Sequence, residues 1–269
     1  MPRFIDLSVT LDPDVVMDPP FMRPTIQRQT HRETVAEARH FFPGITAEQF
    51  PGGEGFAASE TLTLSTHNGT HLDAPWHYHP TQDEALGDGG RPAMTIDEVP
   101  LDWCFRPGVK LDFRHLPDGH VVTAAEVEAE LARIGHELRP LDIVLVATCA
   151  GERLGEPDFL AAGCGMGFEA TMYLTGRGVR VTGIDAWSWD APFVHTARRV
   201  AETGDTSLVW EGHKAGREIG FCHMEKLTNL DLLPPHGFTV CCFPAKVKGG
   251  SAGWTRAVAI LDDTRANQA

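Results

Sequence analysis

The chain has 269 residues, 42% of them hydrophobic, and a formal net charge of −14 at pH 7. The length and apolar content allow one large domain with a sizeable core, and the charge argues against nucleic acid and anionic membrane surfaces as partners, because both would repel it. The first residues show no signal peptide and no apolar run reaches the roughly 18–20 residues of a membrane span, so we expect a soluble, cytoplasmic protein that handles small molecules.

The first part of the chain mixes strand-like and irregular segments. Residues 3–11 alternate in polarity and predict a strand, and residues 32–40 predict a short helix. This helix lies within a Gly- and Pro-rich stretch, residues 24–60, which we expect to be a lid or an inter-subunit arm because long irregular segments of compact domains are seldom plain spacers. Residues 59–66 alternate with period two and predict a strand leading into a histidine-rich segment.

The clearest predicted helix covers residues 123–135. Thr123 and Glu126 form a capping box, and apolar residues then repeat at helical spacing as far as Gly135. Because helices and strands mix without strict alternation, we expect a single α/β domain over residues 1–269 with a largely buried mixed sheet. The other predicted elements are a helix at 167–178 and strands at 108–114, 142–148, 179–185, 237–247 and 255–261.

The cysteines show no C-x-x-C pair, which sets aside a four-cysteine zinc knot and predicts reduced core thiols. Cys222 stands beside His223, but neighbours in sequence rarely have the geometry of a catalytic Cys–His pair, so a cysteine nucleophile is the weaker alternative. The six cysteines are Cys104, Cys149, Cys164, Cys222, Cys241 and Cys242.

The segment "STHNGTHLDAPWHYHP", residues 65–80, gathers histidines around a turn signal. An Asn-Gly pair after an alternating strand predicts a tight turn that returns His67 to the side of His71. His71 and Asp73 are two residues apart, which places them on one face of an extended segment. Two imidazoles and a carboxylate form a good ligand set for Zn²⁺ or Mn²⁺.

The rest of this segment and a second region complete the candidate site. Pro75 redirects the chain and His77 follows, whereas we expect His79 to be a supporting or surface residue. A divalent ion held by three ligands commonly takes further ligands from elsewhere, and composition alone does not choose among the candidates in the second region. These are Glu211, His213, Glu218, His223 and Glu225.

The run "HNGTHLDAPWH" resembles the H-x-G-T-H-x-D-x-P-x-H motif of the cyclase-like metal-dependent hydrolases, a family that includes bacterial kynurenine formamidase and isatin hydrolase. The segments "FIDLSVTL", "GVRVTGIDAWSWD", "MEKLTNLDLLP" and "FPAKVKGGSAGWTRAVAIL" also resemble its pattern, so the similarity extends from residue 4 to 261. The resemblance implies a mixed, barrel-like sheet flanked by helices, of the swivelling β/β/α type. It also implies a homodimer or homotetramer in which residues 24–60 reach a neighbouring subunit.

The resemblance also implies roles for individual residues. His67, His71 and Asp73 would hold one metal, and Asp73 would help His213 and Glu225 to hold a second. A glutamate at position 225, where isatin hydrolases have glutamine, favours two ions over one. His77 would be the general acid/base, with an unperturbed pKa of about 6.5. His223 and Glu218 match nothing in the family and are expected to be ordinary helix or loop residues.

The substrate is less defined by the sequence. The run "VATCAG" replaces an Arg-Thr-Gly-Trp-like run that borders the active site in relatives, which makes Thr148 a candidate substrate-binding residue. Trp76 could stack on a planar substrate, and so could Trp187 and Trp189, although packing explains each of these two equally well. We therefore predict hydrolysis of an amide, lactam or formamide C–N bond of a small aromatic substrate. The alternatives are a lactone hydrolase or cyclase with the same metals, and a non-catalytic metal- or small-molecule-binding protein.

Overall fold

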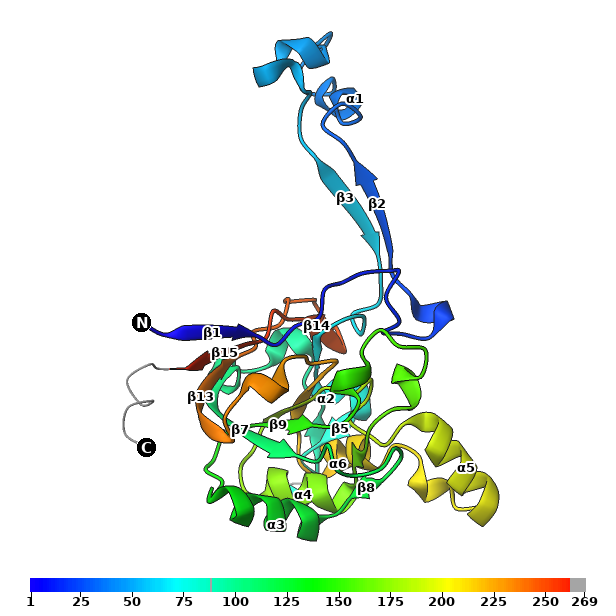
Figure 1. The fold of residues 1–269 in the computed structure, drawn as a ribbon, viewed down its shortest axis with the longest axis vertical. Coiled ribbons are helices and arrows are strands. Elements are labelled where there is room, and N and C mark those ends of the chain that lie inside the picture. The colour runs from blue at the N-terminus through cyan, green and yellow to red at the C-terminus, as the bar shows by residue number, and fades with distance from the viewer. Residues whose placement is uncertain (88, 262–269) are drawn as a thin grey trace.

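A nine-stranded mixed sheet forms the centre of the molecule in the computed structural model, which describes residues 1–87 and 89–261 (Figure 1). Residues 88 and 262–269 of the predicted domain lie outside the described part. The strands are β1 (Arg3–Asp6), β4 (His71–Asp73), β7 (Phe105–Asp112), β9 (Ile143–Ala147), β11 (Val181–Ile184), β12 (Cys222–Glu225), β13 (His236–Cys241), β14 (Ala252–Trp254) and β15 (Val258–Leu261).

These strands lie in the order β1-β15-β13-β7-β9-β11-β12-β4-β14. The central strands β7, β9, β11 and β12 are parallel to one another, and antiparallel strands join both sides of this group. Three small two-stranded sheets lie outside the main one. They pair β2 (Thr25–Gln29) with β3 (Ser59–Thr63), β5 (Thr81–Gln82) with β6 (Arg91–Pro92), and β8 (Val121–Val122) with β10 (Gly165–Met166).

Both faces of the sheet are buried. Along β9, Val144 and Val146 pack in the cluster that includes Val127 and Leu174, whereas Ile143 and Leu145 belong to the cluster on the opposite face. A strand covered on both sides carries a continuous apolar run, which β9 shows. The helices are α1 (Val35–Ala38), α2 (Pro75–Tyr78), α3 (Ala124–Ile134), α4 (Phe168–Gly176), α5 (Phe193–Thr203) and α6 (Glu211–Glu218). The expected α/β class, with a curled mixed sheet flanked by helices, is confirmed (Figure 1).

Helix α3 shows why local patterns predict some elements well. The Thr123 hydroxyl accepts the backbone N–H of Glu126, and the Glu126 carboxylate accepts the N–H of Thr123. Gly135 ends the helix at a φ of +66°, a left-handed conformation that glycine adopts without penalty. The predicted capping box and helix end are both confirmed.

Other elements are shorter than predicted. Strand β1 ends at Asp6, whose carboxylate accepts the backbone N–H of Ser8 at 3.1 Å and starts a turn. The helix expected at 32–40 is reduced to the single turn of α1, and the strand expected at 237–247 ends at Cys241, ahead of Pro244. The errors therefore lie in element lengths rather than types.

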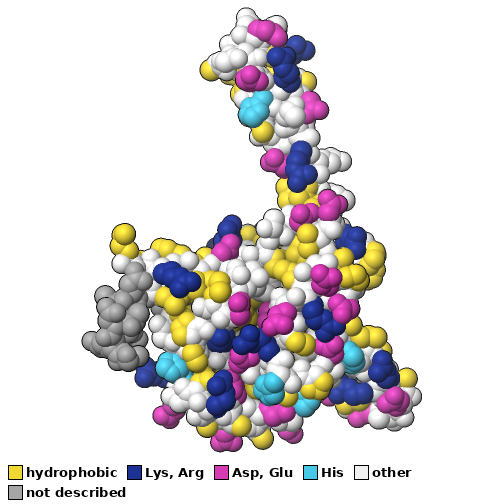
Figure 2. All heavy atoms as spheres, viewed as in Figure 1, with side chains coloured by type: hydrophobic (Ala, Val, Ile, Leu, Met, Phe, Trp, Pro, Cys, Tyr) yellow, Lys and Arg dark blue, Asp and Glu magenta, His cyan; other side chains and the backbone are white. Residues whose placement is uncertain are grey.

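Residues 24–60 project from the body as a hairpin of β2 and β3 with α1 near its tip (Figure 1). Figure 2 shows charged and hydrophobic side chains mixed along this projection. Phe41 is 75% exposed and Phe42 is 52% exposed, which is unusual for aromatic side chains of an isolated subunit. The projection lacks the packing against other elements that usually supports a two-stranded hairpin. A hairpin of this kind on its own is only marginally stable in water.

The cysteines and helices agree with the expectations from composition. All six cysteines are free thiols, and Cys104, Cys164, Cys222 and Cys242 are buried. Burial raises the pKa of Cys222 well above its ordinary value, which makes its thiol a poor nucleophile. Within the described residues, no helix combines the length and the apolar content needed to cross a membrane.

Candidate metal centre

The histidine-rich segment folds into the predicted turn. The backbone N–H of Ser65 donates to the Asn68 side chain at 2.7 Å, and the N–H of Asn68 returns to the Ser65 carbonyl at 3.1 Å. Gly69 then adopts a φ of +60°, which favours glycine. The turn brings the rings of His67 and His71 to a centroid separation of 5.2 Å, as predicted.

Asp73 lies at the centre of the cluster, and four imidazoles surround its buried carboxylate. Oδ1 lies 2.9 Å from Nδ1 of His67 and 3.3 Å from Nε2 of His71. Oδ2 lies 3.2 Å from Nε2 of His223 and 3.8 Å from Nε2 of His77. The two oxygens of one carboxylate thus face two different groups of ring nitrogens.

Strand pairing and helix α6 supply the other members of the cluster. In the antiparallel pair of β4 and β12, His223 lies opposite Asp73 and Glu225 lies opposite His71. Residues two apart share a face of a strand, so both pairs point to the same side. His213 enters from α6, with its ring centroid 4.6 Å from that of His223. The predicted ligands His67, His71, Asp73, His213 and Glu225 therefore all lie in one cluster.

Hydrogen bonds from outside the cluster orient two of the imidazoles. His71 Nδ1 lies 2.8 Å from the carbonyl oxygen of Gly69, and His213 Nδ1 contacts the Asp190 carboxylate. Both acceptors can only accept, so Nδ1 carries the proton in each ring. Nε2 of each ring is then left with a lone pair directed at the cluster, which is the arrangement found at metal-ligating histidines.

Tyr78 and Ser251 hold the next two rings. The Tyr78 hydroxyl lies 3.0 Å from Nδ1 of His223, and the Ser251 hydroxyl lies 3.0 Å from Nε2 of His67. His223 therefore faces the cluster through Nε2, whereas His67 faces it through Nδ1. Each ring uses its outer nitrogen for orientation and offers its inner nitrogen to the centre.

Several buried atoms at the centre lack hydrogen-bond partners. Nε2 of His71 and both carboxylate oxygens of Asp73 are of this kind, although ring nitrogens approach those oxygens at 2.9–3.3 Å. Buried polar atoms are almost always satisfied in native proteins, so this convergence of unshared lone pairs calls for a cation. Two groups have ligand atoms within 4.8 Å of one another: Asp73, His213, His223 and Glu225, and His67, Asp73 and His77. Imidazole and carboxylate donors suit Zn²⁺ and Mn²⁺.

The electrostatics of the cluster support the same conclusion. Burial raises the pKa of Glu225, but contacts with His223 outweigh burial and hold that pKa at about 2. Burial lowers the pKa of His223, but Asp73 and Glu225 outweigh it and raise that pKa to about 9. Burial lowers the pKa of His77 to about 4, with Asp73 opposing and His213 adding to the effect. Two ionised carboxylates are thus buried together, and they require positive charge beside them.

A cavity of about 250 Å³ opens over the cluster. Aromatic side chains form much of its wall: Trp187 and Phe193 meet edge to face at 5.1 Å, and Trp210 stacks on His213 at 4.5 Å. The lining residues are Met22, His67, His77, Trp187, Ser188, Phe193, Trp210, His213, Glu225 and Lys226. No residue of segment 24–60 is among them.

Two predicted substrate-binding residues do not line this cavity. Trp76 is 45% exposed: successive side chains of α2 are about 100° apart, and of the neighbours Trp76 and His77 only His77 lines the cavity. Thr148 is fully buried, and its hydroxyl donates to the Asp185 carboxylate at 2.7 Å. It lines a separate cavity of about 300 Å³ with Asp185. Of the three predicted substrate-binding residues, Trp187 is the one that lines the cavity over the cluster.

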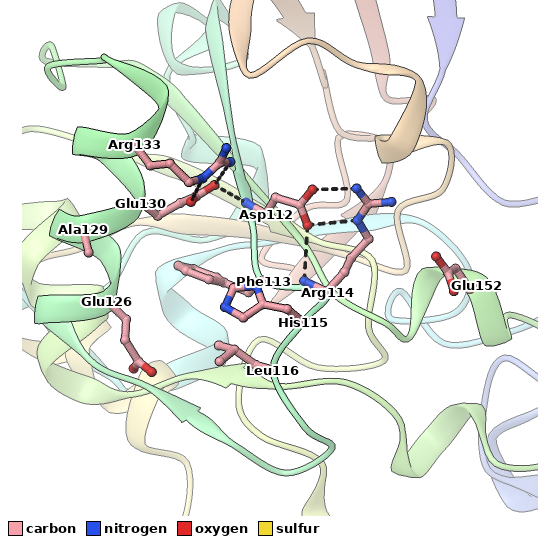
Figure 3. A pocket seen from close by; sticks show the side chains of 10 residues that line it. All are labelled: Asp112, Phe113, Arg114, His115, Leu116, Glu126, Ala129, Glu130, Arg133 and Glu152. Atoms are coloured by element: carbon pink, nitrogen blue, oxygen red, sulfur yellow. Dashed lines mark hydrogen bonds and ion pairs between the residues drawn. The ribbon is translucent and has the colours of Figure 1, made fainter.

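A larger hollow, of about 650 Å³, lies elsewhere, between β7 and α3. Figure 3 shows that four of its charged side chains are paired, Arg114 with Asp112 and Arg133 with Glu130, whereas the two other carboxylates drawn, those of Glu126 and Glu152, face no partner among the residues shown. None of the clustered histidines lines it. Charged groups that are already paired on an open surface offer few unused hydrogen-bonding positions to a ligand. The size of a cavity alone therefore does not identify the functional site.

The predicted placement of His223 is the main error of the sequence interpretation. We expected an ordinary helix or loop residue, but His223 is a fully buried member of strand β12 and its Nε2 lies 3.1 Å from Oε1 of Glu225. The spacing of two from Glu225 was the available signal, because it places both residues on one strand face. Glu218 ends α6 outside the cluster, and His79 contacts Thr81, as expected for residues outside the site.

Known proteins share this architecture. The sequence matches the family described as "Putative cyclase" over residues 5–191, more than half of the chain. Isatin hydrolase A from Ralstonia solanacearum superposes with a TM-score of 0.73 at 22% identity, covering 97% of this chain and 92% of that one. Isatin hydrolase A from Labrenzia aggregata, bound to benzyl benzoate, gives 0.70 at 22% identity with 97% and 94% coverage. A potential metal-dependent hydrolase with cyclase activity gives 0.63 at 19% identity with 98% and 100% coverage. At these identities the structural likeness shows a shared fold.

Proposed function

Because the chain belongs to the cyclase family, we propose that it is a metal-dependent hydrolase that cleaves an amide, lactam or formamide C–N bond of a small aromatic substrate. The observation that carries the proposal is the buried convergence of imidazole nitrogens and carboxylate oxygens around Asp73, with both of its oxygens lacking hydrogen bonds. Such a convergence is unfavourable without a cation, and a cation held below an open cavity is equipped for catalysis.

Divalent ions, zinc or manganese, would be held by residues that the structure brings together. His67, His71 and Asp73 would hold one ion, and Asp73, His213 and Glu225 would hold the other. When bound, a divalent ion supplies a water acidified from a pKa of 15.7 toward about 7 and polarises a carbonyl group. Asp73 is placed to serve both ions, because its two oxygens face different donors.

His77 is the proposed general acid and base. Its ring lines the cavity with the side chain 24% exposed, and its Nε2 lies 3.8 Å from Asp73 Oδ2. The rings of His67 and Trp210 hold it at centroid distances of 4.2 and 5.3 Å. From this position the imidazole accepts a proton from the attacking water at one nitrogen and later delivers it to the leaving nitrogen of the substrate.

The cavity wall supports a small, flat and apolar substrate. Trp187, Phe193 and Trp210 present ring surfaces, and a volume of about 250 Å³ is at the lower end for small-molecule sites. Two of the structural relatives are isatin hydrolases by name, and isatin is a planar bicyclic lactam that fits this description. We include isatin and N-formylkynurenine as the first substrates to be assayed.

The projecting hairpin supports a proposed homodimer or homotetramer. Its exposed Phe41, Phe42 and Phe56 would be buried against a second copy of the chain, which would also provide the packing that the hairpin lacks. Apart from further copies of the chain, the proposed partners are small molecules. The proposed location is the cytoplasm.

The experiment that tests the function measures hydrolysis by the metal-loaded protein of isatin, N-formylkynurenine and an aromatic lactone. Asp73→Asn should abolish turnover because it removes the shared carboxylate, and His79→Gln provides a matched control outside the cluster. Lactone cleavage without C–N cleavage would replace the amide proposal with the lactonase alternative. Metal binding without turnover of any substrate would favour a binding protein.

A further inference from the structure

His223 lies at the buried end of the cluster and matches nothing in the family motifs that the sequence carries. We propose that His223 is a metal ligand that completes, with Asp73, His213 and Glu225, a four-residue site for a divalent cation. This inference rests on the proposed metal-dependent function, but it assigns a residue that the motifs leave out. All four side chains are buried, and their ligand atoms lie within 4.8 Å of one another.

The hydrogen bonds around Tyr78 indicate which nitrogen of His223 is available. The Tyr78 hydroxyl lies 3.0 Å from His223 Nδ1 and 3.3 Å from the backbone carbonyl of Asp73. The carbonyl can only accept, so both contacts are satisfied when Nδ1–H donates to the hydroxyl and the hydroxyl donates to the carbonyl. Nε2 then faces the carboxylates, and these two negative groups require either a proton or a metal ion on it.

A single proton on His223 does not provide partners for all the buried polar atoms of the site. A proton on Nε2 of His223 can be shared with Glu225 Oε1 at 3.1 Å, but it leaves the Asp73 oxygens without partners. It also leaves Nε2 of His213 facing the cluster, because Asp190 holds the other ring nitrogen. One divalent ion would use all four donors at once, which makes it the better occupant.

The spacing of the donors agrees with coordination. Nε2 of His223 lies 3.2 Å from Asp73 Oδ2 and 3.1 Å from Glu225 Oε1. Zinc bonds of 2.0–2.1 Å in tetrahedral geometry place ligand atoms about 3.3 Å apart, so these edges need only small adjustments. A tyrosine hydroxyl on the outer nitrogen is also the kind of supporting contact that ligating histidines make.

The proposal predicts that the two metal positions differ in retention. Four buried protein ligands would close the inner position, whereas His67 and His77 at the outer one are only half-buried. Closed four-ligand sites are typical of structural metals, and positions with a free coordination site are typical of catalytic ones. The inner ion should therefore exchange slowly and the outer ion readily.

The test measures bound zinc or manganese and its dissociation constants, by elemental analysis and by competition with a chromogenic chelator. Wild type should bind two equivalents, one of which resists the chelator. His223→Gln should weaken that equivalent by at least about 100-fold, because loss of a supporting partner alone costs about 10–100-fold. Tyr78→Phe removes only the hydroxyl and should weaken it by about 10–100-fold, and His79→Gln should leave both affinities unchanged.

Two results would overturn the proposal. One is a folded His223→Gln protein that keeps both equivalents with wild-type affinities, and the other is a wild type that binds one equivalent while the variant gains a second. Tyr78→Phe decides the matter if His223→Gln fails to fold, because unchanged binding in that variant also contradicts the proposal. Substrate turnover by a wild type that binds one metal would support the proposed function and contradict the proposed second site. Binding of two metals without turnover would support the second site and contradict the proposed function.

Discussion

Asp190 offers the sharpest test of how the metal centre is positioned. One carboxylate oxygen contacts Nδ1 of His213, and the other accepts the backbone N–H of Gly212 at 2.8 Å. Asp190 therefore orients a proposed ligand and caps the first turn of α6 at the same time. Asp190→Asn keeps the size of the side chain but replaces one acceptor with an NH₂ donor and removes the negative charge. Whichever way the amide turns, His213 loses its carboxylate partner.

The magnitude follows from these two contacts. Loss of the His213 partner should weaken metal binding by about 10–100-fold, or about 1.4–2.7 kcal/mol. Loss of the helix cap should cost about 0.5–2 kcal/mol of unfolding free energy whether or not metal is present. Bound metal stabilises the native state in proportion to the logarithm of its affinity, so the increase in stability on adding excess metal should be smaller by about 1.4–2.7 kcal/mol in Asp190→Asn.

The assay is denaturant unfolding of wild type and variant, each with and without a fixed excess of zinc or manganese. Asp205→Asn is the matched control, because Asp205 also accepts a backbone N–H at a helical turn, that of Ser207 at 2.9 Å, but contacts no histidine of the cluster. The control should lose stability equally in both conditions. An Asp190→Asn protein whose metal-dependent increase equals that of wild type would refute the positioning role.

Three further predictions test other parts of the account. His77→Gln should retain metal but lower kcat by about 10²–10⁴-fold in steady-state assays, and loss of metal instead would identify His77 as a ligand. Burial raises the pKa of Asp185 from 3.8 to about 7, so the folded state binds more protons than the unfolded state over this interval and wild-type stability falls by about 1.4 kcal/mol per unit as pH rises through it. Asp185→Asn should lack this decline, so its stability relative to wild type should rise between pH 5 and 7 in denaturant titrations. A difference in stability that stays constant with pH would contradict the raised pKa of Asp185. Replacing residues 30–58 by Asn-Gly keeps the pairing of Gln29 with Ser59 and should convert a wild-type oligomer to a monomer in sedimentation, whereas a monomeric wild type would rule out the arm.

Local signals in the sequence predict the parts of the site that depend on local geometry. The Asn-Gly turn, the spacing of His71 and Asp73, and the capping box at Thr123 all depend on neighbouring residues, and the structure confirms each. The ligand candidates His213 and Glu225 came from family resemblance, since charged residues on a helix or strand do not distinguish themselves by composition.

The other parts of the site depend on contacts between segments that are distant in sequence. The role of His223 follows from the register of β12 against β4, and the role of Asp190 follows from the placement of α6, neither of which is encoded within a short window. Trp76 lies outside the cavity over the cluster, because the short helix α2 turns it away from the side on which its neighbour His77 lies. Thr148 also lies outside that cavity, and its hydroxyl donates to Asp185 in a separate one.

The most direct test of the central claim is a titration of catalytic activity against bound metal. Protein stripped with a chelator would be reloaded stepwise with zinc or manganese, and hydrolysis of isatin and N-formylkynurenine would be followed at each step. We expect the stripped protein to be inactive and turnover of at least one substrate to return in proportion to the metal bound at the Asp73 cluster. Undiminished turnover by the stripped protein, or failure of the reloaded protein to bind any metal, would contradict this expectation.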